Sequence, residues 1–120
     1  MKRIAMLGAV ILVSAMGGPV RGATQYGYWV TDLGVLCPNT NTWVEAINSA
    51  GQAVGYAPTS SGSYHAFLYS AGHMRDLNDL LPSSSGWTLM QGWGINDLGQ
   101  ITGYGTINGQ YHAFLMTPVH

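Results

Sequence analysis

Four histidines, five carboxylates and one cysteine are the first side chains to consider for catalysis or metal binding in this chain of 120 residues. His65 and His112 lie in the same local sequence, Tyr-His-Ala-Phe-Leu, and such matched histidines raise the question of zinc. Zinc sites collect three or four His, Cys or carboxylate ligands in a small volume. No acidic residue recurs at a matching position close to either histidine, so we expect each imidazole to donate a hydrogen bond that fixes a turn between strands.

The acidic residues show neither a calcium-binding nor a catalytic pattern. Calcium loops place oxygen ligands at alternate positions with glycine between them, and the stretches 76–79 and 96–97 lack that spacing. A glycosidase needs two carboxylates facing each other across a cleft, and nothing in the sequence indicates a cleft beside 76–79 or between Glu45 and Asp97. We therefore expect these residues to cap turns, and we predict no metal, no cofactor and no catalytic residue.

Nucleophile and dinucleotide motifs are also missing. The sequence has no Gly-x-Ser-x-Gly elbow, and the glycine pair at 103–105 lacks the following helix that a dinucleotide site needs. Cys37 is interpreted as a small buried hydrophobe. Because it is the only cysteine, a disulfide would have to join two chains. The residues do not favour an enzyme, and a small hydrolase is only our third hypothesis.

Aromatic side chains are the better functional lead, because flat rings stack on sugars and the chain has thirteen Phe, Trp and Tyr residues but few charges. Trp43, Trp87 and Trp93 have no partner at a matching position, and they are our candidates for ligand-facing aromatics. Apolar residues that do recur are expected in or near the core, since repeats preserve what packs. These are Phe67, Leu68, Phe114 and Leu115.

The N-terminus has the three-part plan of a secretory signal peptide. Two basic residues precede an apolar run from 4 to 16, which is short for a membrane span, and small residues follow. We expect cleavage after Gly22, so that residues 1–22 are removed; cleavage after Gly17 and an uncleaved anchor are the alternatives. Residues 23–120 would then be secreted or periplasmic, without a C-terminal anchor.

Removal of the leader changes the charge balance. The remaining 98 residues keep Arg75 as their only Lys or Arg against five acidic residues, a net charge of −4. This surface lacks the cationic footprint that nucleic acids and anionic lipids require. We therefore expect no nucleic-acid partner and no membrane partner after cleavage, which leaves self-association, another extracellular protein or a glycan.

The mature chain contains two copies of one unit. Residues 46–56 return as 94–104 at an offset of 48, and residues 64–68 return as 111–115 at an offset of 47. Such a period indicates a repeat fold. The repeat signature comprises Ile47, Asn48, Gly51, Gln52, Gly55, His65, Ala66, Phe67, Ile95, Asn96, Gly99, Gln100, Gly103, His112, Ala113 and Phe114.

Each copy predicts short antiparallel strands. The tetrapeptides 48–51 and 96–99 indicate type I turns closed by a left-handed glycine, a common hairpin connection. In the first copy we then expect a polar loop, a third strand at 64–69 and a turn at Ala71-Gly72. A strand end near 73–77 and a helical turn near 78–81 follow. In the second copy we expect a shorter loop at 105–109. About four strands per unit is typical of a propeller blade.

The segment 28–34 echoes the end of a unit, because Thr31-Asp32-Leu33-Gly34 aligns with Arg75-Asp76-Leu77-Asn78. The chain would then begin in the last strand of one unit and end on the third strand of another. Closed propellers use this arrangement to build one blade from both termini. We divide the mature chain, 23–120, into units of about 28–76 and 77–118.

The ordered set of motifs resembles the HAF repeat family of exported bacterial proteins, named for the His-Ala-Phe triplet found here at 65–67 and 112–114. The stretch 81–118 is also similar to the usual carboxyl end of such proteins. The resemblance implies an extracellular, β-rich protein without an assigned activity, so it transfers no catalytic residue. Family members usually have more repeats, and many carry a C-terminal anchoring segment that is not seen here.

Two units are few for a repeat protein, because stacked repeats bury their faces against neighbours and about three are normally needed. Self-association, packing of the two units as a small β-sandwich, and an unstable remnant remain open. We predict an all-β fold of short antiparallel strands, propeller-blade-like or a small β-sandwich. The expected function is that of a secreted, non-catalytic structural or interaction module, and the alternative is a carbohydrate-binding module that uses exposed Trp and Tyr.

Overall fold

A computed structural model describes residues 26–119, and the chain divides into one unit that ends at Asp32 and a second that starts at Leu33. The predicted signal peptide, 1–22, lies outside the described residues. Residues 26–32 form neither helix nor strand, so the strand expected from the echo at 28–34 is not observed. Among the described residues, no helix is long and apolar enough to cross a membrane.

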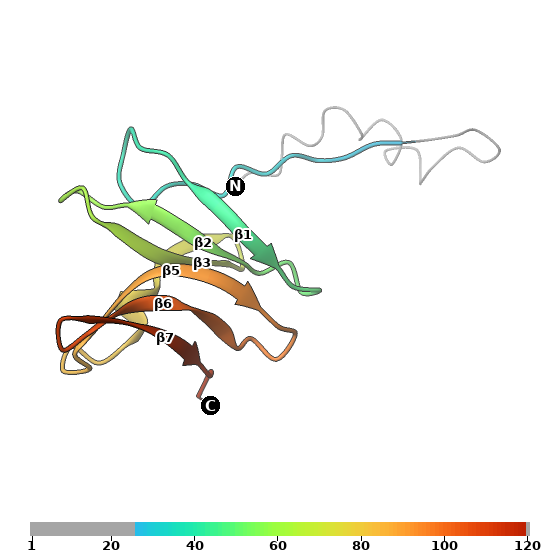
Figure 1. Ribbon diagram of the computed structural model, residues 1–120. Coiled ribbons are helices and arrows are strands. Elements are labelled where there is room, and N and C mark those ends of the chain that lie inside the picture. Colours follow the sequence, from blue (N-terminus) through green and yellow to red (C-terminus); the bar gives the residue numbers. More distant parts are fainter. Residues whose placement is uncertain (1–25, 120) are drawn as a thin grey trace. The chain divides into compact units, whose positions relative to one another are not determined.

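The unit from Leu33 onward consists of seven strands in two antiparallel sheets (Figure 1). The first sheet contains β1 (Trp43–Ile47), β2 (Ala53–Pro58), β3 (Tyr64–Ser70) and β4 (His73–Asp76), and the second contains β5 (Trp87–Ile95), β6 (Ile101–Ile107) and β7 (Gln110–Met116). A short 3-10 helix, η2 (Leu77–Leu80), connects them. Figure 1 shows two layers in which β5 lies against the first sheet. The all-β prediction is confirmed, in its small β-sandwich form.

The signature Asn and Gln residues build the hairpin turns. Asn48 Oδ1 accepts hydrogen bonds from the backbone N–H groups of Ala50 and Gln52, at 3.1 and 2.9 Å, and Asn48 Nδ2 donates to Gln52 Oε1 at 2.8 Å. Asn96 and Gln100 repeat these contacts in the second sheet. The closing glycine of the first turn, Gly51, has φ +79°, a region that glycine enters without steric cost. The predicted hairpins are confirmed.

The signature glycines Gly55 and Gly103 are required by a close approach of two strands. The first strand of each sheet is bulged opposite them, so the backbone oxygen of Trp43 or Gln91 points at the glycine. A Cβ on either glycine would lie 1.9 Å from that oxygen. No other residue fits there.

One face of each sheet forms the core. Val54 and Ala66 lie on the same face of the first sheet, and Ile101 and Phe114 share a face of the second, because cross-strand partners point to the same side. These residues pack together with Leu77 and Leu89 in one buried cluster. We call these two surfaces the inner faces, and the opposite surfaces the outer faces. The sheets approach closely at β5, where a Cβ on Gly92 would lie 3.2 Å from Val54 Cβ.

The two repeats, which form the first and the second sheet, stack in the same direction. The inner-face positions Val54 and Ala66 of the first sheet match Thr102 and Ala113, which lie on the outer face of the second sheet. A mirror-image sandwich would instead bring matching faces together. Each repeat therefore presents one kind of face to the repeat before it and the other kind to the repeat after it.

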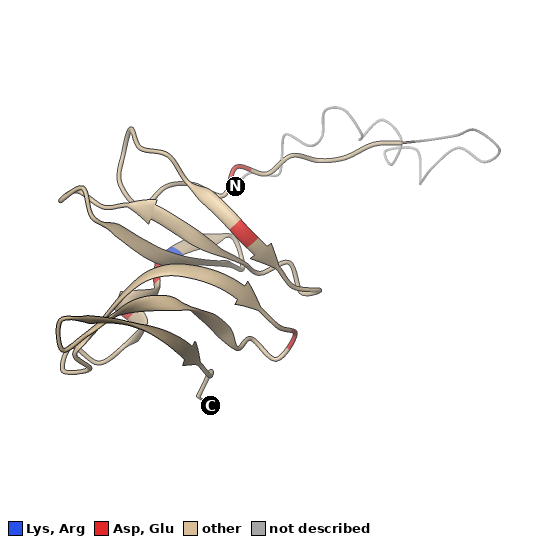
Figure 2. Cartoon of the chain, in the orientation of Figure 1, with Lys and Arg blue, Asp and Glu red and all other residues tan. Residues whose placement is uncertain are grey.

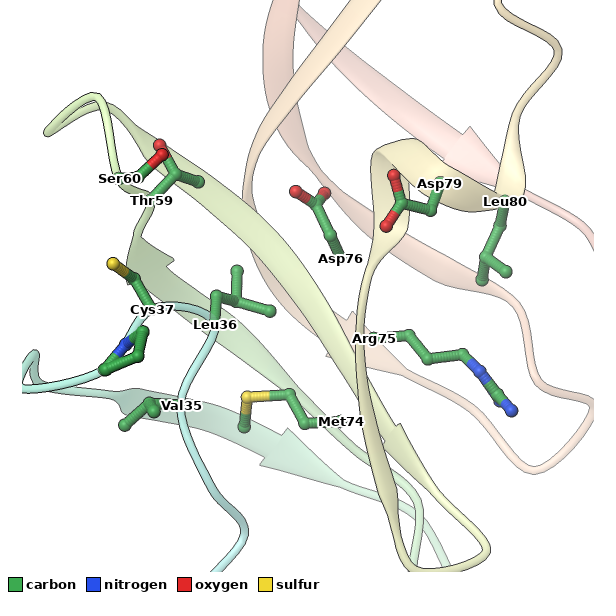
Figure 3. A pocket seen from close by; sticks show the side chains of 11 residues that line it. Val35, Leu36, Cys37, Thr59, Ser60, Met74, Arg75, Asp76, Asp79 and Leu80 are labelled. Atoms are coloured by element: carbon green, nitrogen blue, oxygen red, sulfur yellow. The ribbon is translucent and has the colours of Figure 1, made fainter.

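The segment 33–42 covers the outer face of the first sheet. Phe67 on that face is fully buried, although it does not belong to the core cluster between the sheets. Gly34 lies beside Met74 of β4, with its ideal Cβ position 4.0 Å from Met74 Cβ. Figure 3 shows Met74 pointing toward Val35 and Leu36 of this segment. A segment that precedes β1 thus closes one end of the stack.

Three expectations about individual positions are corrected. Leu115 was expected in or near the core but is 62% exposed, because no described residue forms a layer over the outer face of the second sheet. The loop expected at 105–109 is a two-residue turn, Asn108-Gly109, with φ of 53° and 76°, and residues 105–107 belong to β6. The helical turn expected at 78–81 begins one residue earlier, at Leu77.

Candidate functional site

The outer face of the second sheet is the candidate site, and an aromatic cluster lies on it. Trp93 falls in a bulge of β5 between Gly92 and Gly94, and its ring meets Tyr104 of β6 edge to face, with ring centroids 5.4 Å apart. Tyr104 meets Tyr111 of β7 in the same manner at 6.0 Å. Edge-to-face contacts at these separations are favourable for aromatic pairs. The three strands therefore hold three rings in one row.

The tryptophan at the end of this row is held in position. Trp93 Nε1 donates a hydrogen bond to Gln91 Oε1 at 2.8 Å. Its side chain is nevertheless 54% exposed, and that of Tyr111 is 70% exposed. The rings thus present apolar surface while the indole N–H is satisfied.

The first sheet carries a related cluster of Trp43, Tyr56 and Tyr64. Here the rings stack, with Trp43 and Tyr56 centroids 5.5 Å apart at an interplanar angle of 15°. Tyr56 and Tyr64 match Tyr104 and Tyr111 in the repeat, so Trp43 and Trp93 contact the same matched tyrosine, Tyr56 or Tyr104. Sequence alignment pairs Trp43 with Gln91 and therefore missed this correspondence. Trp93 instead occupies the bulged position of β5, which matches Glu45 in the bulge of β1.

Trp87, the third candidate aromatic, lies on the inner face of the second sheet. It is half-buried and meets Phe114 edge to face, with ring centroids 6.2 Å apart. It lines an apolar groove of about 990 Å³ together with Leu68, Leu81 and Met116. The structure does not bring the three candidate tryptophans together, and Trp87 is a packing residue.

The candidate face carries no formal charge on its strands. None of β5, β6 and β7 contains Asp, Glu, Lys or Arg (Figure 2). The exposed side chains Thr102, Ala113 and Leu115 extend the apolar surface beside the aromatic row. Large contiguous apolar surfaces of this kind mark interaction sites.

The turns of the two repeats contact each other through matched residues. Asn48 Nδ2 donates to the backbone oxygen of Asn96 at 3.0 Å, and the backbone N–H of Ser49 donates to Asp97 Oδ1 at 2.9 Å. Hydrogen bonds from the Ser49 backbone and side chain hold the pKa of the Asp97 carboxyl below its ordinary value. Asp97 therefore joins the two repeats, whereas the sequence predicted only a turn-capping role.

His65 and Asp76 tie the first sheet to β5. His65 Nδ1 and Asp76 Oδ2 lie 2.6 Å apart, and Asp76 Oδ1 accepts from the backbone N–H of Asn78 at 2.8 Å. The side chain of Asn78 then bonds both the N–H and the oxygen of Leu89 in β5. The expected turn capping by Asp76 is confirmed, whereas the hydrogen bond expected to link His65 to a turn instead joins it to the carboxylate of Asp76 in β4.

His112, the repeat partner of His65, is in a different situation. It is exposed and contacts Trp87 edge to face, with ring centroids 6.4 Å apart. In the first sheet the carboxylate comes from β4, and among the described residues no strand takes the place of β4 beside β7. The two histidines thus share a sequence but not a contact.

The remaining signature residues differ in burial. Phe67, Phe114 and Ala66 are buried, and Ile95 packs against the core cluster. Ile47 and Ala113 are exposed. Gln52 extends the first turn by donating to Ser70 at the end of β3, at 3.0 Å, and Gln100 extends the second by donating to Thr117, just after β7, at 3.3 Å.

Cys37 lies half-buried in the covering segment and is a free thiol. It lines a cavity of about 670 Å³ on the outer face of the first sheet, whose wall also includes Thr59, Asp76 and Asp79 (Figure 3). Within residues 26–119, no group of three or more His, Cys, Asp or Glu side chains is placed to hold a metal ion.

Comparisons of the chain with family models, with curated proteins and with solved structures found no match.

Proposed function

We propose that this protein is an exported, non-catalytic interaction module of the HAF repeat type, which associates through the outer face of its second sheet. One observation carries the proposal. Positions that bury the first sheet against the second, such as Ala66, recur in the second sheet as exposed positions, such as Ala113. A surface whose counterpart is an interface inside the same chain is well suited to be an interface between chains.

The composition of this face supports the proposal. Aromatic residues are enriched at protein interfaces, and charged residues are depleted at their centres. Trp93, Tyr111 and Leu115 are more than half exposed, at 54%, 70% and 62%, on strands without formal charge. Burial of apolar surface contributes about 25 cal/mol per Å², so covering these side chains favours association.

Size-exclusion chromatography with light scattering on protein that starts at Ala23 tests the proposal. We expect a discrete oligomer for the wild-type chain and a folded monomer for Leu115→Glu, which places a charge in the proposed interface. Leu98→Glu is the matched control, because Leu98 is 77% exposed in the turn between β5 and β6, outside the strands that carry the outer face. Equal assembly by Leu115→Glu and the wild type would contradict the proposal.

A carbohydrate-binding module is the second candidate, and the geometry of Trp93 favours it. The hydrogen bond from Trp93 Nε1 to Gln91 fixes an indole ring that stays 54% exposed. Flat rings held in this way stack on sugars at little entropic cost. Glycan-array binding that is lost in Trp93→Ala, and kept in the folded control Trp87→Ala, would support this function.

A further inference from the structure

Among residues 26–119, no strand of the second sheet is the counterpart of the fourth strand of the first sheet. The first sheet has the order β1-β2-β3-β4, and the second has β5-β6-β7, although residues 111–115 of β7 repeat residues 64–68 of β3 at an offset of 47. No strand among residues 26–119 pairs with the outer edge of β7. Natural edge strands are commonly protected by charges, prolines or bulges. β7 contains none of these protections.

The first sheet shows what such a fourth strand would contact. Asp76 of β4 is paired with Phe67 of β3, and its carboxylate lies 2.6 Å from His65. Leu77 follows directly and is fully buried, in the cluster that contains Ala66. The matching positions in the second sheet are Phe114, His112 and Ala113, of which His112 and Ala113 are exposed.

The chain contains one segment with the sequence of such a strand. Thr31-Asp32-Leu33 matches Arg75-Asp76-Leu77, and the preceding residues Tyr28, Trp29 and Val30 are types enriched in strands. Tyr28 and Val30 are 85% and 92% exposed, and Trp29 is 45% exposed. This apolar segment has the composition of a strand that gains energy from pairing.

The connection that follows residues 28–32 also resembles the connection that follows β4. After the first sheet, β4 leads into η2, whose Leu77 lies between the two sheets before the chain enters β5. The segment 33–42 leads into β1 in the same way, and it covers the outer face of the first sheet, the face that is equivalent to the inner face of the second. It occupies the place that a connection from a preceding unit would occupy.

We propose that residues 28–32 of a second copy of this chain add to β7 as its fourth strand. Asp32 of that copy then pairs with Phe114 and brings its carboxylate to His112, and Leu33 of that copy lies over Ala113 and Leu115. The outer face of the second sheet stacks on the covered outer face of the neighbour's first sheet. This inference rests on the proposed association through that face and specifies the partner and the strand that it exchanges.

The connectivity of the chain favours a second copy, rather than the same chain, as the donor of the strand that pairs with β7. Gly34 is held beside β4 of its own first sheet, where its backbone oxygen accepts a hydrogen bond from Thr42 Oγ1 at 2.8 Å. β7 belongs to the second sheet, which packs on the opposite, inner face of the first. Since Asp32 precedes Gly34 by only two residues, a strand that ends at Asp32 pairs with the β7 of another molecule while Gly34 keeps its place.

The symmetry of this contact predicts a ring. Every copy offers a strand at one end and an acceptor edge at the other, which is a heterologous, head-to-tail interface. Such interfaces give closed rings when the rotation closes. Each copy supplies two blade-like sheets, so a ring with the usual four to eight blades of a propeller contains about two to four copies.

Cysteine trapping between different chains tests the strand register directly. In the first sheet Arg75 is opposite Leu68, which predicts that Thr31 of one copy is opposite Leu115 of another. Opposite residues in antiparallel strands are close enough for a disulfide. In a Cys37→Ala background, a mixture of the single variants Thr31→Cys and Leu115→Cys should form a covalent dimer. The control mixture of Thr31→Cys with Tyr111→Cys should not, because Tyr111 lies about 13 Å further along the strand.

Light scattering of the full mature chain separates this inference from the proposed function. Val30→Pro removes a backbone N–H from the donated strand, and it should convert the ring to a folded monomer, whereas Tyr26→Pro, outside the matched positions, should leave the ring intact. Assembly that survives Val30→Pro but is lost in Leu115→Glu would overturn strand exchange and leave the interaction face standing. A wild-type chain that remains monomeric, or equal trapping in both cysteine mixtures, would also overturn the exchange.

Discussion

The two sheets are copies of one sequence pattern, yet they differ in what covers them. Val54 and Ala66 of the first sheet are fully buried, whereas their counterparts Thr102 and Ala113 in the second are exposed. The backbone, the turns and the bulges beside Gly55 and Gly103 are the same in both. The comparison teaches that the repeat specifies a sheet with two different faces, and that the burial of each face depends on the next layer.

The strongest shared constraint is the close approach at the signature glycines. A Cβ at position 55 or 103 would overlap a backbone oxygen at 1.9 Å, so Gly55→Ala and Gly103→Ala should each destabilise the fold by about 4 kcal/mol or more, at the top of the range for single mutations. Urea denaturation or the loss of soluble protein measures the effect.

Gly109→Ala is the matched control for these variants. Gly109 has φ +76° but no atom within 4 Å of its Cβ position. Its substitution should therefore cost only the left-handed backbone term, about 1–2 kcal/mol. Similar losses for all three variants would show that the close approach is not the dominant constraint.

Matched leucines sharpen the comparison between the two faces. Leu68 packs against the core cluster, so Leu68→Ala should cost about 2 kcal/mol, the lower end of the range for core leucines. Leu115 is 62% exposed, and Leu115→Ala should change the stability of the monomer by about 0.5 kcal/mol or less. Denaturation at a protein concentration where the chain is monomeric measures both values. Equal losses would mean that the outer face of the second sheet is covered within one chain.

The two turn asparagines should differ in their contribution to stability by about one hydrogen bond. Asn48→Ala removes the local turn contacts and the bond to the backbone oxygen of Asn96, so it should cost about 2 kcal/mol. Asn96→Ala removes only the matching local contacts and should cost about 1 kcal/mol. Thermal or chemical denaturation distinguishes them, and a reversed order would contradict the contact between the turns.

Acid should weaken the contact between the repeats slightly. The pKa of Asp97 is lower in the folded chain than its ordinary value of 3.8, because the charged carboxylate accepts hydrogen bonds from Ser49. The stabilisation is therefore present above that pH and is lost as the pH falls through the lowered pKa. Asp97→Asn keeps an acceptor oxygen without the titration, so it should flatten the decline in melting temperature below about pH 4. An unchanged acid profile in this variant would count against the role of Asp97.

Several elements could be predicted from local sequence because their causes are local. Asn48 and Gly51 specify their turn locally. The asparagine oxygen accepts hydrogen bonds from the backbone N–H groups two and four residues ahead, and the glycine takes the positive φ. The turn at Ala71-Gly72 was predicted for the same reason. The Asn108-Gly109 pair is an equally strong hairpin signal that could have corrected the expected loop at 105–109.

Other features could not be predicted because they depend on contacts between distant residues. Leu68 and Leu115 follow the same four residues, Tyr-His-Ala-Phe, but only Leu68 faces another sheet. Trp93 joins the aromatic row from the bulged position of β5, which matches Glu45 of β1, so alignment of the two copies does not pair it with Trp43. His65 finds a carboxylate on β4, whereas among the described residues β7 has no such neighbour for His112.

The sequence by itself determined that the chain is all β, where most of its strands lie, and which residues form the turns between them. These properties follow from hydrogen bonds and backbone preferences that act within a few residues. Only the tertiary structure decided which face of each sheet is buried, that the units stack in one direction, and that a charge-free aromatic face stays open. Burial is a property of the layer on the other side, and identical strands cannot specify it alone.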